Sequence, residues 1–236
     1  MIDLPVGLPS ELVPLSWLIG VWEGSGVLEY KIGEESVSKT FGHRISFSQD
    51  GLPHLNYSSY TWLEPEVASA ETDAAASAGT YPGAAENAAA ALLPPALPPE
   101  MMSDEKIPLV TETGYWRLSR HQGDGDPGPG MLPGTGERPF TSAAAVETLR
   151  NRDGGFDIEV TLVHPGGVAE LYLGQVKGPR IDLATDAVLR TAGAKPYAAA
   201  TRLYGLVDNH LLWAWDIAAL GQDLRTHASG RLARVQ

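Results

Sequence analysis

Cysteine is absent from all 236 residues of the chain. Without a thiol, the protein cannot form a disulfide, a thiolate nucleophile, a zinc–cysteine site or a cysteine-ligated iron–sulfur cluster. Any metal must therefore be held by one of the six histidines or by carboxylates, or be carried inside a cofactor.

Long apolar runs are also missing. The chain has no uninterrupted stretch of about 18 apolar residues, the length that a membrane-spanning helix requires. Residues 1–20 lack the basic start and the apolar stretch of a secretion signal. These absences predict a cytoplasmic protein without a membrane partner.

Basic residues are few, with 17 Lys and Arg against 29 Asp and Glu, for a formal net charge of -12. Proteins that bind nucleic acid neutralise phosphates with basic side chains, so nucleic acid is not an expected partner. A homodimer is as compatible with the sequence as a monomer.

Short runs of β-branched and aromatic residues alternate with polar residues through most of the chain, and turn residues such as Asp-Gly and Pro-Gly separate them. An antiparallel meander of about ten such strands must close on itself to hide its edges. We therefore predict an all-β fold, a single up-and-down β-barrel like those of lipocalins and fatty-acid-binding proteins. The runs occupy residues 26–30, 43–48, 55–63, 113–119, 145–151, 156–164, 169–176, 180–188, 199–207, 211–217 and 229–235.

One segment has helical character. In residues 10–20, Ser10 can cap a helix, and Leu12, Leu15 and Leu18 or Ile19 fall on one face. We expect this short N-terminal helix to cover one end of the barrel.

Two segments differ in composition from the rest. Residues 66–106 are rich in Ala, Pro, Glu and Ser, and residues 121–143 are rich in Gly and Pro. We expect both to be insertions in loops of one domain that spans residues 1–236, because the remaining residues suit a single core.

Catalytic motifs of the common kinds are missing. No Gly-x-Ser-x-Gly elbow follows a strand, and the glycines of "GVWEGSG" precede no βαβ unit that could bind a dinucleotide. A barrel of this size can enclose a small ligand. His227 is the most notable histidine, because the small residues Ala228, Ser229 and Gly230 follow it and leave room for a flat ligand. Spacing alone does not decide between a metal ligand and an ordinary strand residue.

The segment "LSWLIGVWEGSG" resembles the Leu-x-Gly-x-Trp-x-Gly-x-Gly element of the nitrobindins, which are haem-binding β-barrels. Its matching residues are Gly20, Trp22, Gly24 and Gly26. The resemblance continues through "ETGYWRL", "VTLVHPGGVAELYLG" and "GQDLRTHASGRLARV", and it skips both insertions.

The resemblance implies a cofactor and an activity. The histidine of the family's Gly-Gln-x-Leu-x-x-His segment is the axial ligand of ferric haem, and Gly221, Gln222, Leu224 and His227 reproduce that segment. The implied cofactor is haem b, the implied reaction is the isomerisation of peroxynitrite to nitrate, and nitric oxide is a further implied ligand. Lys195 lies where the family has a lysine near the haem edge, and it could pair with a propionate.

The sequence departs from the family after the glycine motif, and also at Gln49, where the family has a histidine. Nitrobindins carry Tyr-Pro-Thr after the glycine motif, whereas this chain has Tyr30, Lys31 and Ile32. Ile32 stands where the family has a threonine close to the haem, and Thr40 is a candidate replacement. Two alternatives stay open: a carrier of a fatty acid or another apolar ligand, and a nitrobindin-like protein that binds haem weakly.

Overall fold

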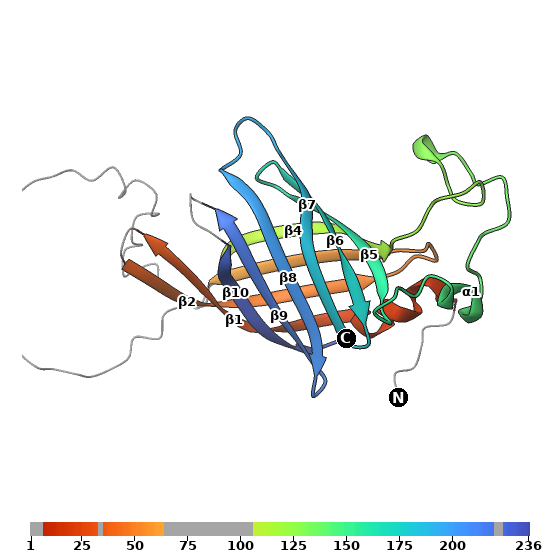
Figure 1. Cartoon of the computed structure of the whole chain (residues 1–236). Coiled ribbons are helices and arrows are strands. Elements are labelled where there is room, and N and C mark those ends of the chain that lie inside the picture. Colours follow the sequence, from red (N-terminus) through yellow and green to blue (C-terminus); the bar gives the residue numbers. More distant parts are fainter. Residues whose placement is uncertain (1–6, 33–34, 64–105, 220–223) are drawn as a thin grey trace, which may run out of the picture.

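The chain folds into one closed antiparallel barrel, shown in Figure 1 as a computed structural model that describes residues 7–32, 35–63, 106–219 and 224–236. Each strand pairs with its neighbours in sequence, and β1 pairs with β10 to close the barrel. This arrangement confirms the predicted up-and-down barrel. The strands are β1 (Gly20–Ile32), β2 (Glu35–Ser48), β3 (Leu55–Leu63), β4 (Ile107–Leu118), β5 (Phe156–His164), β6 (Val168–Lys177), β7 (Arg180–Arg190), β8 (Tyr197–Val207), β9 (His210–Ala219) and β10 (Arg225–Arg234).

The core forms because the strands alternate with a period of two residues. In β5, Phe156, Ile158, Val160 and Leu162 are buried, whereas Asp157 and the other intervening side chains are more exposed. Successive side chains of a strand point to opposite faces, so this pattern directs one apolar set into the barrel.

The N-terminal segment forms η1 (Ser10–Leu18), a 3-10 helix. A 3-10 helix has three residues per turn, so Leu12, Leu15 and Leu18 fall on one face, and all three are fully buried. The predicted cap is wrong: Pro9 precedes the helix, Ser10 lies within it, and no side chain caps its start. Because η1 contacts β4 and β6, it covers one end of the barrel as predicted, here named the helix end (Figure 1).

The connection between β4 and β5 also lies at the helix end and contains η4 (Pro129–Met131) and α1 (Ala143–Glu147). The strand predicted for residues 145–151 is wrong, because Ser142 accepts a hydrogen bond from the Ala145 N–H and starts a helix. Arg120 anchors this connection by bonding Asp126 at 2.7 and 2.6 Å and by pairing with Glu11 of η1. The other predicted insertion lies outside the described residues, except for Lys106.

The glycine motif of β1 allows close packing. A Cβ on Gly26 would lie 2.3 Å from the Ser229 carbonyl oxygen and 2.7 Å from the Phe41 ring. Trp22 is buried beneath η1, and its indole N–H donates a hydrogen bond to the Leu18 carbonyl at 2.7 Å. Gly20 has a φ of 132°, which side chains rarely adopt. The motif therefore allows β1 to pack closely against β2, β10 and η1.

The opposite end of the barrel is named the open end. In an antiparallel barrel alternate connections lie at the same end, so the connections β1–β2, β5–β6 and β7–β8 share it. Val110 of β4 lies on the inner face with Glu112 and Gly114 by alternation, yet it is 45% exposed. Apolar inner wall is therefore reachable from solvent at this end. Among the described residues, no helix has the length and apolarity needed to cross a bilayer.

Candidate functional site

His227 is placed in the barrel by a β-bulge near the start of β10. Thr226 pairs with Asp216 of β9 and Ala228 pairs with Trp215, which leaves His227 as an extra residue between them. A bulge re-aims a side chain that regular alternation would turn outward. The His227 ring meets Trp215 of the inner face edge to face, with centroids 5.6 Å apart and planes at 84°.

The surroundings of His227 favour a neutral imidazole. Its partial burial lowers its pKa, and a hydrogen bond that it donates to the backbone carbonyl of Glu29 opposes this shift. A neutral imidazole carries its hydrogen on one nitrogen, here held by Glu29, and a lone pair on the other. That lone pair is what a metal requires.

The inner wall around His227 is apolar. Leu28 of β1 pairs with Ala228, and Ile217 of β9 lies two residues beyond Trp215 on the same face. Both Leu28 and Ile217 are half-buried and pack against the core. Ala228, which pairs with Leu28, is also buried.

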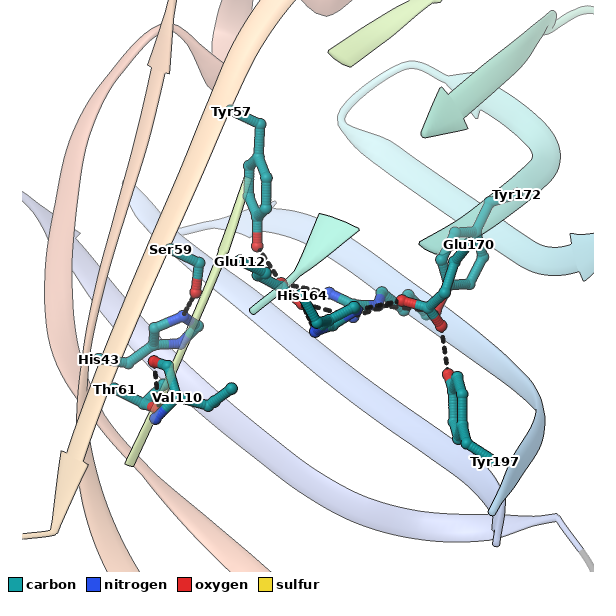
Figure 2. A network of polar contacts seen from close by, with 11 residues as sticks. His43, Tyr57, Ser59, Thr61, Val110, Glu112, His164, Glu170, Tyr172 and Tyr197 are labelled. Atoms are coloured by element: carbon teal, nitrogen blue, oxygen red, sulfur yellow. Dashed lines mark hydrogen bonds and ion pairs between the residues drawn. The ribbon is translucent and has the colours of Figure 1, made fainter. Parts of the chain in front are cut away.

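A buried polar cluster crosses the barrel from β3 to β8 (Figure 2). Its members are Tyr57, Glu112, His164, Glu170, Tyr172, Tyr197 and Arg202. Arg202 bonds both oxygens of Glu112, at 2.6 and 2.8 Å, and the Tyr57 hydroxyl donates to Glu112 at 2.6 Å. Burial alone would raise the pKa of Glu112, but the Arg202 charge and its hydrogen bonds lower it to about 2. Glu112 is therefore ionised at physiological pH.

The second carboxylate of the polar cluster is Glu170, which is also buried. It contacts His164 Nε2 at 2.6 Å, accepts from the Tyr172 hydroxyl at 2.6 Å, and accepts from the Tyr197 hydroxyl. Burial would raise the pKa of Glu170, but the bond from His164 and the Arg202 charge lower it.

The polar cluster includes a set of metal-ligand type, since ligand atoms of Glu112, His164 and Glu170 lie within 4.8 Å of one another. Arg202 already supplies positive charge to both carboxylates, at 2.6 Å from Glu112 and 3.5 Å from Glu170. A divalent cation would have to share this space with a guanidinium. The polar cluster is therefore complete as an ion-pair network.

His43 of β2 borders the polar cluster. Its Nε2 contacts the Ser59 hydroxyl at 2.7 Å, and its ring lies 4.8 Å from that of Trp213. Burial lowers the pKa of His43 to about 4, against the opposing effect of the Glu112 charge.

Acidification is expected to destabilise the fold through His43. In the unfolded chain the His43 imidazole is protonated near pH 6.5, whereas the folded chain keeps it neutral down to about pH 4. The stability contribution is therefore complete above pH 6.5 and falls by up to about 3 kcal/mol as the pH drops through that window. Urea unfolding at several pH values should show a shallower pH dependence for His43→Gln. His121→Gln, at an exposed position, should behave like the parent, and equal pH dependence in all three proteins would contradict the prediction.

The structure places the other predicted site residues as follows. Lys195 is exposed in the β7–β8 connection, at the same end of the barrel as His227. Thr40 is exposed on the outer face, because the inward positions of β2 are Phe41 and His43. Ile32 is the last residue of β1. Gly221 and Gln222 lie outside the described residues.

Sequence reasoning did not assign Trp215, which contacts His227, or Arg202 and Glu112 of the polar cluster to the site. Alternation gave a usable signal for Arg202, which stands at an inward position between Ala200 and Tyr204. A charged residue among buried positions implies a buried partner.

The fold and the site together define a class of protein. It is a closed β-barrel with an apolar inner wall that is open at one end and a histidine whose surroundings favour the neutral imidazole. Comparisons with known proteins then identify the family. Residues 11–234 match the family described as "THAP4-like, heme-binding beta-barrel domain". The chain therefore belongs to this family of haem-binding barrels, and the resemblance to nitrobindins is confirmed.

Curated relatives match over the full length. A protein of Clavibacter michiganensis subsp. michiganensis named "Peroxynitrite isomerase" is 62% identical, with all of both chains covered. Proteins of the same name from Leifsonia xyli subsp. xyli and Kocuria rhizophila are 56% and 46% identical, each over the whole of this chain and over 100% and 96% of their own lengths. The crystal structure of Rv2717c from M. tuberculosis has the same fold, with a TM-score of 0.57, 22% identity, and 99% and 100% of the two chains covered.

The residues of the site fit a haem. His227 offers one neutral nitrogen ligand. The inner wall is apolar, as the faces of a porphyrin require, and Val110 shows that solvent reaches it from the open end. Lys195 and Arg190 supply cations at the rim, where propionates would meet water.

Proposed function

We propose that the protein isomerises peroxynitrite to nitrate at a ferric haem held by His227. The observation that carries this proposal is the inward-facing, neutral imidazole on an apolar wall that is open at one end. The names of the full-length relatives support the same reaction.

Each part of the site has a role in this proposal. His227 would hold the iron through one ring nitrogen, while the hydrogen bond to the Glu29 backbone would hold the other nitrogen in its protonated form. Leu28, Ile217 and Val110 would supply apolar wall for a porphyrin. When bound, ferric haem would supply a Lewis-acidic iron for the isomerisation of peroxynitrite.

The reaction takes up and releases no net proton, because peroxynitrite and nitrate are isomers and carry the same charge. The buried side chains are also poorly suited to transfer one. Glu112 is ionised and already held by Arg202, and burial raises the pKa of the Tyr172 and Tyr197 hydroxyls. The polar cluster therefore serves to build the site, and the haem performs the chemistry.

The proposal also covers the form of the haem, the partner of its propionates and a second ligand of its iron. Haem b is the proposed form, since the chain has no cysteine for the thioether bonds of a c-type haem. Lys195 is the proposed partner of a propionate. Nitric oxide is a proposed second ligand of the iron.

The alternative of a carrier for a fatty acid has less support. The carboxylate headgroup of a fatty acid inside the barrel would need a cationic partner. The buried Arg202 already donates hydrogen bonds to both oxygens of Glu112. Recovery of lipid from the purified protein, together with a hemin titration that shows no saturable spectral change, would favour the carrier.

The proposed reaction is tested by mixing peroxynitrite with the hemin-loaded protein in a stopped-flow instrument. The decay rate is expected to rise in proportion to the loaded protein, with nitrate as the product in place of nitrite. The protein without hemin and free hemin are the controls. Decay no faster than in those controls would refute the activity. Ile32→Thr, tested beside the parent, shows whether Ile32 weakens haem binding.

A further inference from the structure

An inward row of side chains connects the polar cluster to His227. In the strand register, Arg202 of β8 pairs with Trp215 of β9, and Trp215 pairs with Ala228 of β10, the neighbour of His227. The Arg202 guanidinium lies 4.6 Å from the centre of the Trp215 ring. Trp215 also makes the edge-to-face contact with His227.

Arg202 is held rigidly at one end of this row. It is 3% exposed, bonds both oxygens of Glu112, and donates from Nε to the Tyr172 hydroxyl at 3.1 Å. A guanidinium stacked on an indole is a favourable cation–π contact, and it is stronger where water is excluded. Trp215 therefore packs against the Arg202 guanidinium, which its hydrogen bonds hold in place.

His227 needs such support because the bulge leaves it without a pairing partner on β9. Its imidazole interacts with the backbone of Glu29 through a hydrogen bond. One hydrogen bond fixes one ring nitrogen, and the ring can still turn about that bond. A flat neighbour at 84° to the imidazole restricts this rotation.

We propose that Trp215 and Arg202 are positioning residues, which fix the plane of the His227 imidazole so that its free nitrogen keeps one direction toward the haem iron. This role rests on the proposed coordination of iron by His227. It also gives the polar cluster a purpose, since Glu112 holds Arg202 in place. Neither Trp215 nor Arg202 touches the reacting atoms in this proposal.

The test measures how fast haem leaves the hemin-loaded protein, using an apoprotein scavenger, together with the electron paramagnetic resonance spectrum of the ferric form. Trp215→Leu is expected to speed haem loss by about 10- to 100-fold, the range typical of groups that orient a metal ligand. It should also broaden the ferric signals, because the imidazole plane then varies. Trp215→Phe keeps an aromatic edge and should restore most of the parent behaviour.

Trp213→Leu is the matched control, since Trp213 is an inward tryptophan of the same strand that packs on His43 and Phe41. Arg202→Lys is a second variant: it keeps the buried charge but loses the flat guanidinium face, and it should speed haem loss several-fold. Urea unfolding of each protein without haem separates positioning from general stability. If urea unfolding shows that Trp215→Leu folds poorly, haem loss is compared among the parent, Trp215→Phe and Arg202→Lys instead.

The outcomes distinguish the two proposals. Faster haem loss and a broadened signal in Trp215→Leu, with rescue by Trp215→Phe and parent-like signals in Trp213→Leu, would support positioning. Equal behaviour of Trp215→Leu and Trp213→Leu would overturn it while leaving His227 as the ligand. A spectrum that does not change in His227→Ala would overturn the ligand assignment, and the positioning role with it.

Discussion

Leucine in place of Arg202 is expected to lower the free energy of unfolding by about 3–5 kcal/mol, the cost of leaving a buried charge without its partner. Arg202 is 3% exposed and lies between Glu112 and Glu170, whose side chains are 9% and 0% exposed. Without the guanidinium, two carboxylates face each other inside the barrel. One of them would have to take up a proton in the folded state.

Urea unfolding of the protein without haem measures this loss. Arg44→Leu is the matched control, because Arg44 pairs with Glu23 at 2.6 Å but is 48% exposed. Exposed pairs contribute about 0–1 kcal/mol, so this variant should stay close to the parent. The double variant Arg202→Leu with Glu112→Leu should recover part of the loss, because it removes one uncompensated charge. Equal losses in Arg202→Leu and Arg44→Leu would show that the polar cluster is not an ion-pair network.

The barrel could be predicted from the sequence because its signals are local. Each strand carries its own alternation, as β5 does from Phe156 to Leu162, and each turn carries its own turn residues. A meander of such strands has few ways to hide its edges, so closure follows from the number of strands. The long-range pairing of β1 with β10 then needs no signal of its own.

Local signals also explain the errors. The run at residues 145–151 contains Val146 and Leu149 with polar neighbours, a spacing that fits either a strand or a helix. The Ser142 cap and three alanines decide for the helix α1. In η1, Pro9 and Pro14 restrict the backbone, so Ser10 lies inside a 3-10 helix and cannot cap it.

The polar cluster could not be predicted, because its partners are far apart in the chain. Arg202 and Glu112 are separated by 90 residues, and Tyr57 and Glu112 by 55. Alternation can show that Arg202 points inward, but it cannot show which acid meets it. Thr40 is a different case, because it lies on the outer face by simple alternation with its inward neighbours Phe41 and His43.

His227 became a candidate through the small residues that follow it, the family resemblance implied its role as iron ligand, and the structure adds the reason for its orientation. Regular alternation from the buried Ala228 and Leu232 would turn residue 227 outward. The bulge between Thr226 and Ala228 reverses this direction. No single residue type announces a bulge, so the sequence alone left the direction of His227 open.

Alanine in place of His227 is expected to weaken hemin binding by more than about 100-fold, beyond the range of about 10–100-fold for groups that only orient a ligand. The reason is the loss of the proposed iron–nitrogen bond, whereas the apolar wall of Leu28, Ile217 and Val110 remains. Hemin titration followed by absorbance should show the Soret band of the parent, and in His227→Ala a band close to that of free hemin. His121→Ala, at an exposed position in the β4–β5 connection, is the control and should match the parent.

Added imidazole makes this test more specific. Removing the side chain leaves a space beside Ala228 and the Trp215 ring that a free imidazole can occupy. Imidazole at millimolar concentration should therefore restore the parent-like Soret band in His227→Ala. A general loss of structure would not be repaired by a small ligand, so rescue separates loss of coordination from misfolding. A parent-like hemin affinity in His227→Ala before any imidazole is added would refute the assignment of His227 as the iron ligand.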